Sequence, residues 1–112
     1  MRTLVIVVVC ACRGGVARPP IDGNRRAADL SASEYDELCT WEVDVTGGPR
    51  TVTCSGDVTV TFKSKADCLA NRVTANCEAT VGQVEDCIDA LDADPCSLGG
   101  SACQPLFACA GM

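Results

Sequence analysis

Apolar residues recur at helical spacing in the stretch that follows Thr80. The residues of this stripe are Val81, Val84, Cys87, Ile88 and Leu91. Intervals of three and four predict an amphipathic helix. Thr80 and Gln83 fit a capping box at its start, and Asp94-Pro95 fits its end. The acidic residues between the apolar ones are expected on the solvent face, and they are Glu85, Asp86, Asp89 and Asp92.

A second helix is predicted from about Ala32 to Thr40 or beyond. Ser31-Ala32-Ser33-Glu34 is a capping box, and Leu30 and Tyr35 occupy hydrophobic-staple positions. Its inner face would carry Tyr35, Leu38 and Cys39. Residues 41–45 then alternate apolar and acidic residues, which fits either a strand or a helix extension ending at Gly47-Gly48. We favour the helix extension.

Residues 50–62 alternate in the manner of strands on both sides of the turn Ser55-Gly56-Asp57. One face would carry Val52, Cys54, Val58, Val60 and Phe62. The other would carry Thr51, Thr53, Thr59 and Thr61, a polar surface able to bind a glycan or a partner strand, although we favour a simple solvent face. An isolated hairpin is only marginally stable, so it is expected to pack on helices.

The remaining segments complete a small disulfide-rich α+β fold, in which short helices pack on one β-hairpin at about residues 50–62. A short helix is predicted from Ser64, with Cys68 and Leu69 on it. Residues 71–79 are expected to form a loop around Cys77. A last short helix is predicted from Ser101 to Cys109, with Pro105 near its start.

Ten cysteines and no histidine in 112 residues change this picture most. This density is typical of disulfide-stabilised proteins from oxidising compartments. The absence of C-x-x-C pairs and of histidine disfavours zinc and thiol-redox sites, so no metal or other cofactor is expected. Eight cysteines would form four disulfides: Cys39, Cys54, Cys68, Cys77, Cys87, Cys96, Cys103 and Cys109. Sequence leaves their 105 possible connectivities open.

Residues 1–12 fit a signal peptide, with one positive charge before the apolar run Leu4–Val9. A buried β-strand is the alternative. Val9-Cys10-Ala11-Cys12 is similar to a lipobox, which makes Cys12 the candidate lipidation site. Ordinary signal peptidase could instead cut after Gly15-Val16-Ala17. Either route leaves eight cysteines for disulfides, because Cys12 carries the lipid in the first and is removed in the second.

Residues 13–30, rich in Gly, Pro and Arg, are predicted to be a flexible basic tether. They hold four Arg and two Asp, a net charge of +2 (4 − 2). Residues 31–112 are predicted to be an acidic disulfide-stabilised domain, with four basic and thirteen acidic residues and a net charge of −9 (4 − 13). Such a domain should avoid nucleic acid and anionic lipid. Its membrane contact is therefore expected through a lipid anchor only.

Catalytic motifs are missing from the sequence. Without histidine no Ser-His-Asp or Cys-His arrangement is possible, and no G-x-S-x-G, Walker or H-E-x-x-H motif occurs. Asp89, Asp92 and Asp94 lack the glycine and terminal glutamate of an EF-hand calcium loop. No catalytic residue is therefore expected, and the protein is predicted not to be an enzyme.

The predicted function is a non-enzymatic, exported cell-envelope lipoprotein that acts as a tethered interaction or structural module on an unknown protein or envelope partner. Its expected location is the outer membrane or the periplasm. The alternative is a small secreted disulfide-rich inhibitor or toxin-like effector. Its binding loop would be Thr46–Arg50 or Leu98–Ser101.

The cysteine spacing and a few flanking residues add one resemblance. They run from Leu38-Cys39-Thr40-Trp41 through Gly47-Gly48, Thr53-Cys54, Cys68, Ala79-Thr80-Val81, Glu85-Asp86-Cys87, Asp94-Pro95-Cys96 and Ala102-Cys103 to Phe107-Ala108-Cys109. This pattern resembles a group of uncharacterised, small, eight-cysteine predicted lipoproteins that are abundant in predatory, myxobacteria-like deltaproteobacteria. The resemblance implies a cell-envelope location and no activity.

Overall fold

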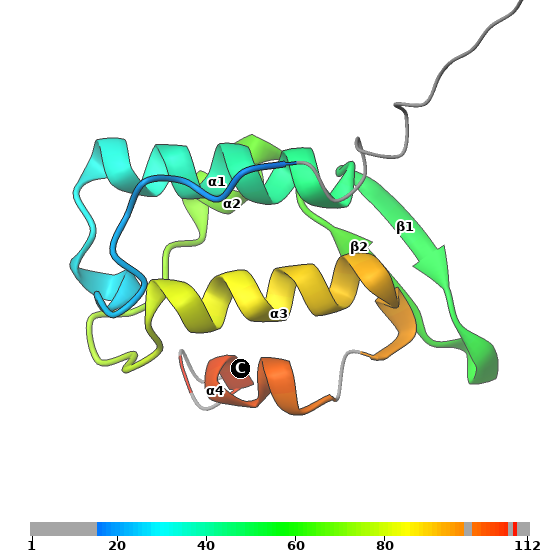
Figure 1. Ribbon diagram of the computed structural model, residues 1–112. Helices are drawn as coiled ribbons and strands as arrows, with labels where there is room; N and C mark the ends of the chain where they lie inside the picture. Colours follow the sequence, from blue (N-terminus) through cyan, green and yellow to red (C-terminus); the bar gives the residue numbers. More distant parts are fainter. Residues whose placement is uncertain (1–15, 98–99, 108, 110–112) are drawn as a thin grey trace, which may run out of the picture.

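The computed structural model describes residues 16–97, 100–107 and 109 of the chain. Within them, two long helices lie side by side, a two-stranded hairpin stands at one end, and shorter helices flank the pair (Figure 1). The elements are α1 (Ala32–Thr46), β1 (Arg50–Thr53), β2 (Thr59–Phe62), α2 (Lys65–Ala70), α3 (Val81–Ala93) and α4 (Gln104–Phe107). This confirms the predicted small disulfide-rich α+β fold with helices on one hairpin.

Helix α1 begins and ends as its sequence predicts. The Ser31 hydroxyl accepts from the Glu34 amide at 3.2 Å, and the Glu34 carboxylate accepts from the Ser31 amide at 2.9 Å. The helix continues through Trp41 and ends at Gly47, whose φ of 71° is a left-handed conformation suited to glycine. The helix extension is therefore confirmed. It brings Trp41 into the same core as Leu38.

Helix α3 has the same kind of start. Thr80 and Gln83 form the predicted capping box, with bonds of 3.2 and 2.9 Å. Its apolar stripe is buried against α1 and the residues around α4. α2 is likewise capped by Ser64, whose hydroxyl accepts from the Asp67 amide at 3.1 Å.

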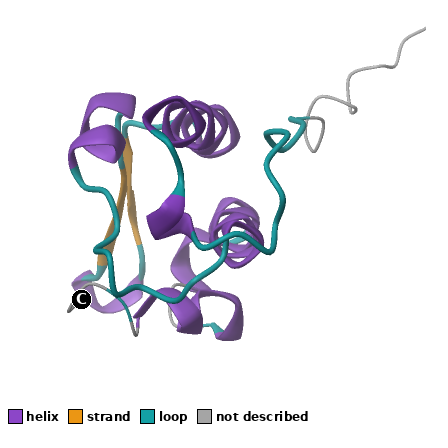
Figure 2. Ribbon diagram, turned by 90° about the vertical axis from the view of Figure 1, so that its left-hand side faces the viewer, coloured by secondary structure: helices purple, strands orange, loops and turns teal. Residues whose placement is uncertain are grey.

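The hairpin is antiparallel, with Val52 opposite Val60 and Arg50 opposite Phe62. Val60 and Phe62 are buried as predicted. Val58 is 54% exposed, so its placement on the buried face is wrong. The reason lies in the turn: Gly56 and Asp57 adopt φ values of 73° and 62° in a short 3-10 segment, and Val58 lies at the end of this segment, before β2 begins at Thr59. Figure 2 shows the two strands, in orange, standing beside the helices.

The eight predicted cysteines form four disulfides, and the structure supplies their pairing: Cys39–Cys68, Cys54–Cys96, Cys77–Cys109 and Cys87–Cys103. The first joins α1 to α2, and the second joins the hairpin turn to the segment after α3. The other two fasten the C-terminal residues to the loop before α3 and to α3 itself. Four disulfides in so small a domain indicate an oxidising, exported environment.

The structure differs from the expected flexible tether at residues 13–30, because much of this stretch packs on the domain. The Ala27 amide donates to the Ala79 carbonyl at 2.9 Å, and the Val81 amide donates to the Arg25 carbonyl at 2.8 Å. Ala27 and Leu30 are buried in the main core. The burial of these two apolar side chains and the two backbone hydrogen bonds hold the stretch on the domain, although its Gly- and Pro-rich composition favours a flexible chain.

The C-terminal part forms a 3-10 turn at Ser101–Cys103 that leads into α4, in place of one helix to Cys109. The signal-peptide region with Cys12 lies outside the described residues, as do residues 98 and 99 of the second candidate loop. Within the described residues, no helix is both long enough and apolar enough to span a membrane.

Candidate functional site

Arg18 is held by three carboxylates of α3, and we call these four residues the Arg18 cluster. Its Nη2 lies 2.5 Å from Asp89 Oδ2 and 3.1 Å from Asp86 Oδ1, and its Nη1 lies 3.5 Å from Glu85 Oε1. Its guanidinium carbon also lies 6.0 Å from the centre of the Trp41 ring. The basic N-terminal segment is thus joined to the acidic domain by opposite charges.

Glu85 corrects one prediction, because it lies in the core and not on the solvent face. Its side chain is 5% exposed, since it points from α3 toward the N-terminal segment that covers it. Burial raises the pKa of Glu85, and the positive charge of Arg18 acts in the opposite direction. Within the described residues, Glu85 Oε2 has no hydrogen-bond partner.

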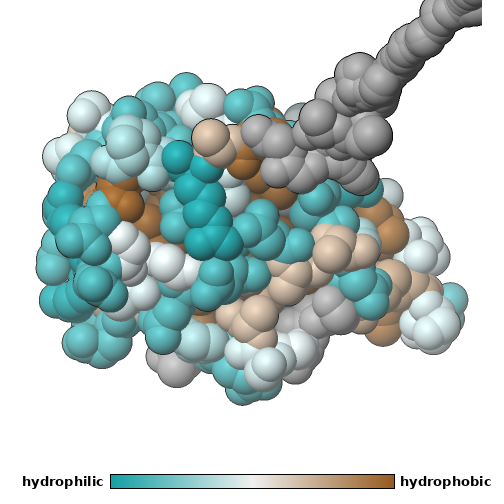
Figure 3. All heavy atoms as spheres, viewed as in Figure 1, coloured by the Kyte–Doolittle hydropathy of each residue, from teal (hydrophilic) through white to brown (hydrophobic). Residues whose placement is uncertain are grey.

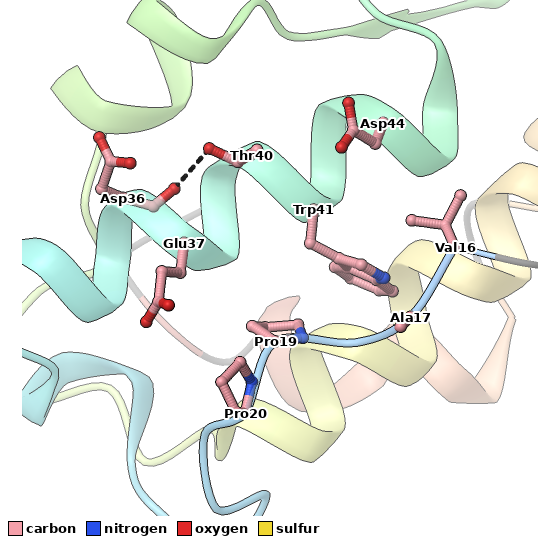
Figure 4. A pocket seen from close by; sticks show the side chains of 9 residues that line it. All are labelled: Val16, Ala17, Pro19, Pro20, Asp36, Glu37, Thr40, Trp41 and Asp44. Atoms are coloured by element: carbon pink, nitrogen blue, oxygen red, sulfur yellow. Dashed lines mark hydrogen bonds between the residues drawn. The ribbon is translucent and has the colours of Figure 1, made fainter.

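Trp41 forms part of a shallow hollow of about 260 Å³ between α1 and the N-terminal segment. Figure 4 shows its indole ring pointing from α1 toward Ala17 and Pro19, while the Asp36 and Glu37 side chains lie nearer the N-terminal end of the helix. Its Nε1 has no hydrogen-bond partner among the described residues. The same side of the molecule is largely hydrophilic, with small separate apolar areas (Figure 3). The hollow is therefore a shallow surface feature, where the N-terminal segment covers the Trp41 ring, and not a deep binding site.

A second space, here called the inner cavity, lies among α1, α2, α3 and α4 and has a volume of about 290 Å³. Buried apolar or aromatic side chains form its floor: Tyr35, Leu38, Val84, Ile88 and Leu91. Exposed residues form its rim: Lys63, Asn71, Arg72 and Phe107. An apolar floor with a few polar rim residues is the usual composition of a small-molecule pocket.

Glu42 is the acidic group of the inner cavity, and it is half-buried. Burial raises the pKa of its carboxyl above the ordinary 4.5, and the charge of Lys63 partly opposes this. Compared with the unfolded chain, the folded state therefore shifts the equilibrium of this carboxyl toward its protonated form. Stability is lost as the pH rises through the folded-state pKa, because the buried group then becomes charged.

We therefore expect Glu42→Gln to raise the free energy of unfolding at neutral pH. The gain should vanish below the ordinary pKa, where both side chains are neutral. Urea unfolding at pH 7 and near pH 4 measures it. Glu37→Gln, on the exposed face of the same helix, is the matched control and should show no comparable gain. A loss of stability for Glu42→Gln at neutral pH would contradict the effect of burial.

The other sequence candidates lie on the surface. The four hairpin threonines are exposed, and the Thr51 and Thr61 hydroxyls are 3.2 Å apart. The loop Thr46–Arg50 is fastened at its end, since Arg50 Nε donates to the Thr46 carbonyl at 2.6 Å and the guanidinium stacks on Phe62. Asp89 pairs with Arg18. No group of three or more potential metal ligands occurs among the residues that the structure describes.

No protein-family model matches the chain, and no curated protein and no solved structure shows significant similarity to it.

The site residues that sequence reasoning missed are Arg18, Glu42 and Arg72. Arg18 lies in a segment of low-complexity appearance, and Glu42 follows Trp41 in an alternating pattern. No local signal in the sequence shows that these residues meet α3 or the inner cavity.

Proposed function

We propose that the protein is a non-enzymatic, exported module of the cell envelope, held there by a lipid on Cys12 and acting through contacts with a protein or envelope partner. The observation that carries the proposal is the set of four disulfides. They match an oxidising compartment, and the apolar run Leu4–Val9 supports export. The resemblance to envelope lipoproteins stays a prediction that agrees with this proposal.

The Arg18 cluster supports a short attachment. Because Arg18 is fixed on α3, only the chain from Cys12 to Arg18 can act as the spacer. Six residue steps span at most about 20 Å when fully extended. A lipid on Cys12 would therefore keep the domain close to the membrane surface. The proposed role is an interaction module that works near its anchor rather than at the end of a long tether.

Intact mass of the mature protein from membrane and medium fractions of a bacterial host tests this proposal. We expect a membrane-bound species that begins at Cys12 and carries acyl mass. Its eight remaining disulfide cysteines should react with an alkylating reagent only after reduction. Cys12→Ala is the control and should lose the acyl mass and the membrane fraction.

Other outcomes of this measurement point elsewhere. A released species beginning near Arg18 would contradict the anchor and favour the secreted inhibitor or toxin-like effector. Cysteines that react without reduction would contradict the exported, disulfide-stabilised state altogether.

A further inference from the structure

The inner cavity lies along stretches of two helices, and this arrangement would accommodate one extended apolar chain in a slot between them. The residues of these two helices that line it extend along α1 from Tyr35 to Glu42 and along α3 from Val84 to Leu91. Each stretch advances seven residues, or about 10 Å along a helix. The two helices run in the same direction (Figure 1), so the N-terminal parts of both stretches lie toward one end of the cavity and their C-terminal parts toward the other.

The volume agrees with this shape. An engineered apolar cavity of ~150 Å³ binds benzene. The inner cavity, at about 290 Å³, has room for a molecule of about twice that size. A single medium-length acyl chain fits this space, whereas a two-chain phospholipid does not.

The rim supplies a cation at one end of the slot. Arg72 Nη2 donates to the Leu30 carbonyl at 2.6 Å, and its guanidinium carbon lies 4.6 Å from the centre of the Tyr35 ring. These contacts fix the guanidinium in place. Among the described residues, no carboxylate lies within ion-pair distance of Arg72. Within the same residues, only one N–H group of its guanidinium donates to a protein acceptor. Arginine carries five such donors in a planar fork suited to carboxylates.

Among the seven basic residues that the structure describes, Arg50, Lys63 and Arg72 have no carboxylate within ion-pair distance, in a chain whose net charge is −6. Arg18, Arg25, Arg26 and Lys65 all have carboxylate partners. At the opposite end of the slot, Lys63 acts on the carboxyl of Glu42. Of the two rim cations, Arg72 is the one whose head group is held by protein contacts, and one fixed guanidinium matches one carboxylate.

We propose that the inner cavity binds a single-chain, medium-length carboxylic acid, with its carboxylate on Arg72 and its chain along the slot toward Leu91. Two independent features carry this inference: the apolar slot of matching length, and the fixed, unpaired guanidinium at its rim. The inference goes beyond the proposed envelope role, and it does not depend on lipidation of Cys12.

Sodium octanoate, titrated into the oxidised protein by calorimetry and by methyl NMR, is the test. We expect saturable binding of one molecule, with shifts at the Val84 and Ile88 methyl groups. Octanol, which has the same chain without the charge, should bind at least about tenfold more weakly, because the charge-assisted bonds to Arg72 are lost. Octylammonium should not bind.

Variants locate the two parts of the ligand. Arg72→Gln should weaken octanoate binding at least about tenfold, and Arg72→Lys should weaken it less, since it keeps the charge but not the fork. Lys65→Gln, a nearby lysine that pairs with Asp36, is the matched control and should leave binding unchanged. Val84→Phe should abolish binding by filling the slot. If Arg72→Gln does not fold, Val84→Phe and the three ligands still decide the question.

The proposal is overturned if octanoate does not bind, or if octanol and octanoate bind equally well. Equal affinity of the wild-type protein and a folded Arg72→Gln variant would overturn it too. So would NMR shifts that lie away from Val84 and Ile88.

Discussion

Replacing Cys39 and Cys68 together by alanine is expected to lower the free energy of unfolding by about 5 kcal/mol. The crosslink closes a separation of 29 residues, which contributes about 3.5 kcal/mol through the entropy of the unfolded chain. Both cysteines are also buried in the main core, at 0% and 5% exposure. Removing two buried sulfur atoms adds roughly 1–2 kcal/mol of lost packing. Urea unfolding of the oxidised proteins measures the change.

The Cys54–Cys96 pair is the control that separates the two contributions. Its separation of 42 residues is longer, so chain entropy alone predicts a loss of about 4 kcal/mol. Cys96 is exposed and Cys54 is half-buried, so little packing is lost with them. The Cys39–Cys68 variant should therefore be the less stable of the two. The reverse order would show that the crosslink between α1 and α2 does not lie in the core.

Trp41→Ala is expected to cost about 3–5 kcal/mol, the usual range for a large buried aromatic side chain. Trp41 is 4% exposed, and its side chain packs between its own helix, α1, and the N-terminal segment that carries Arg18. Its loss should also loosen that segment, which faster amide hydrogen exchange at Ile21 would report. Chemical denaturation gives the change in stability.

Trp41→Phe is the matched variant, because it keeps an aromatic ring and removes the indole N–H. Since Nε1 has no partner among the described residues, no hydrogen bond should be lost. We expect a cost of about 1–2 kcal/mol, from the smaller ring alone. Equal costs for the alanine and phenylalanine variants would contradict this description of the Trp41 environment.

Local sequence patterns predicted the helices and strands of the fold, but they did not always predict which residues of these elements are buried. The capping boxes at Ser31 and Thr80 predicted both helix starts, because the groups that satisfy the first amides lie three residues apart. The same kind of reasoning misplaced Val58, since alternation cannot show where strand pairing resumes after a turn. It also placed Glu85 in solvent, because periodicity does not show which neighbouring segment will cover a helix.

The sequence by itself determined the fold class, the helix ends, the hairpin and the presence of a disulfide framework. Each of these depends on residues close together in the chain, or on composition. Only the tertiary structure decided the pairing of the eight cysteines, the packing of Ala27 and Leu30 in the core, the Arg18 cluster and the inner cavity. These features form where segments distant in sequence meet, and their energies depend on burial and on the distances between charges, which no local pattern records.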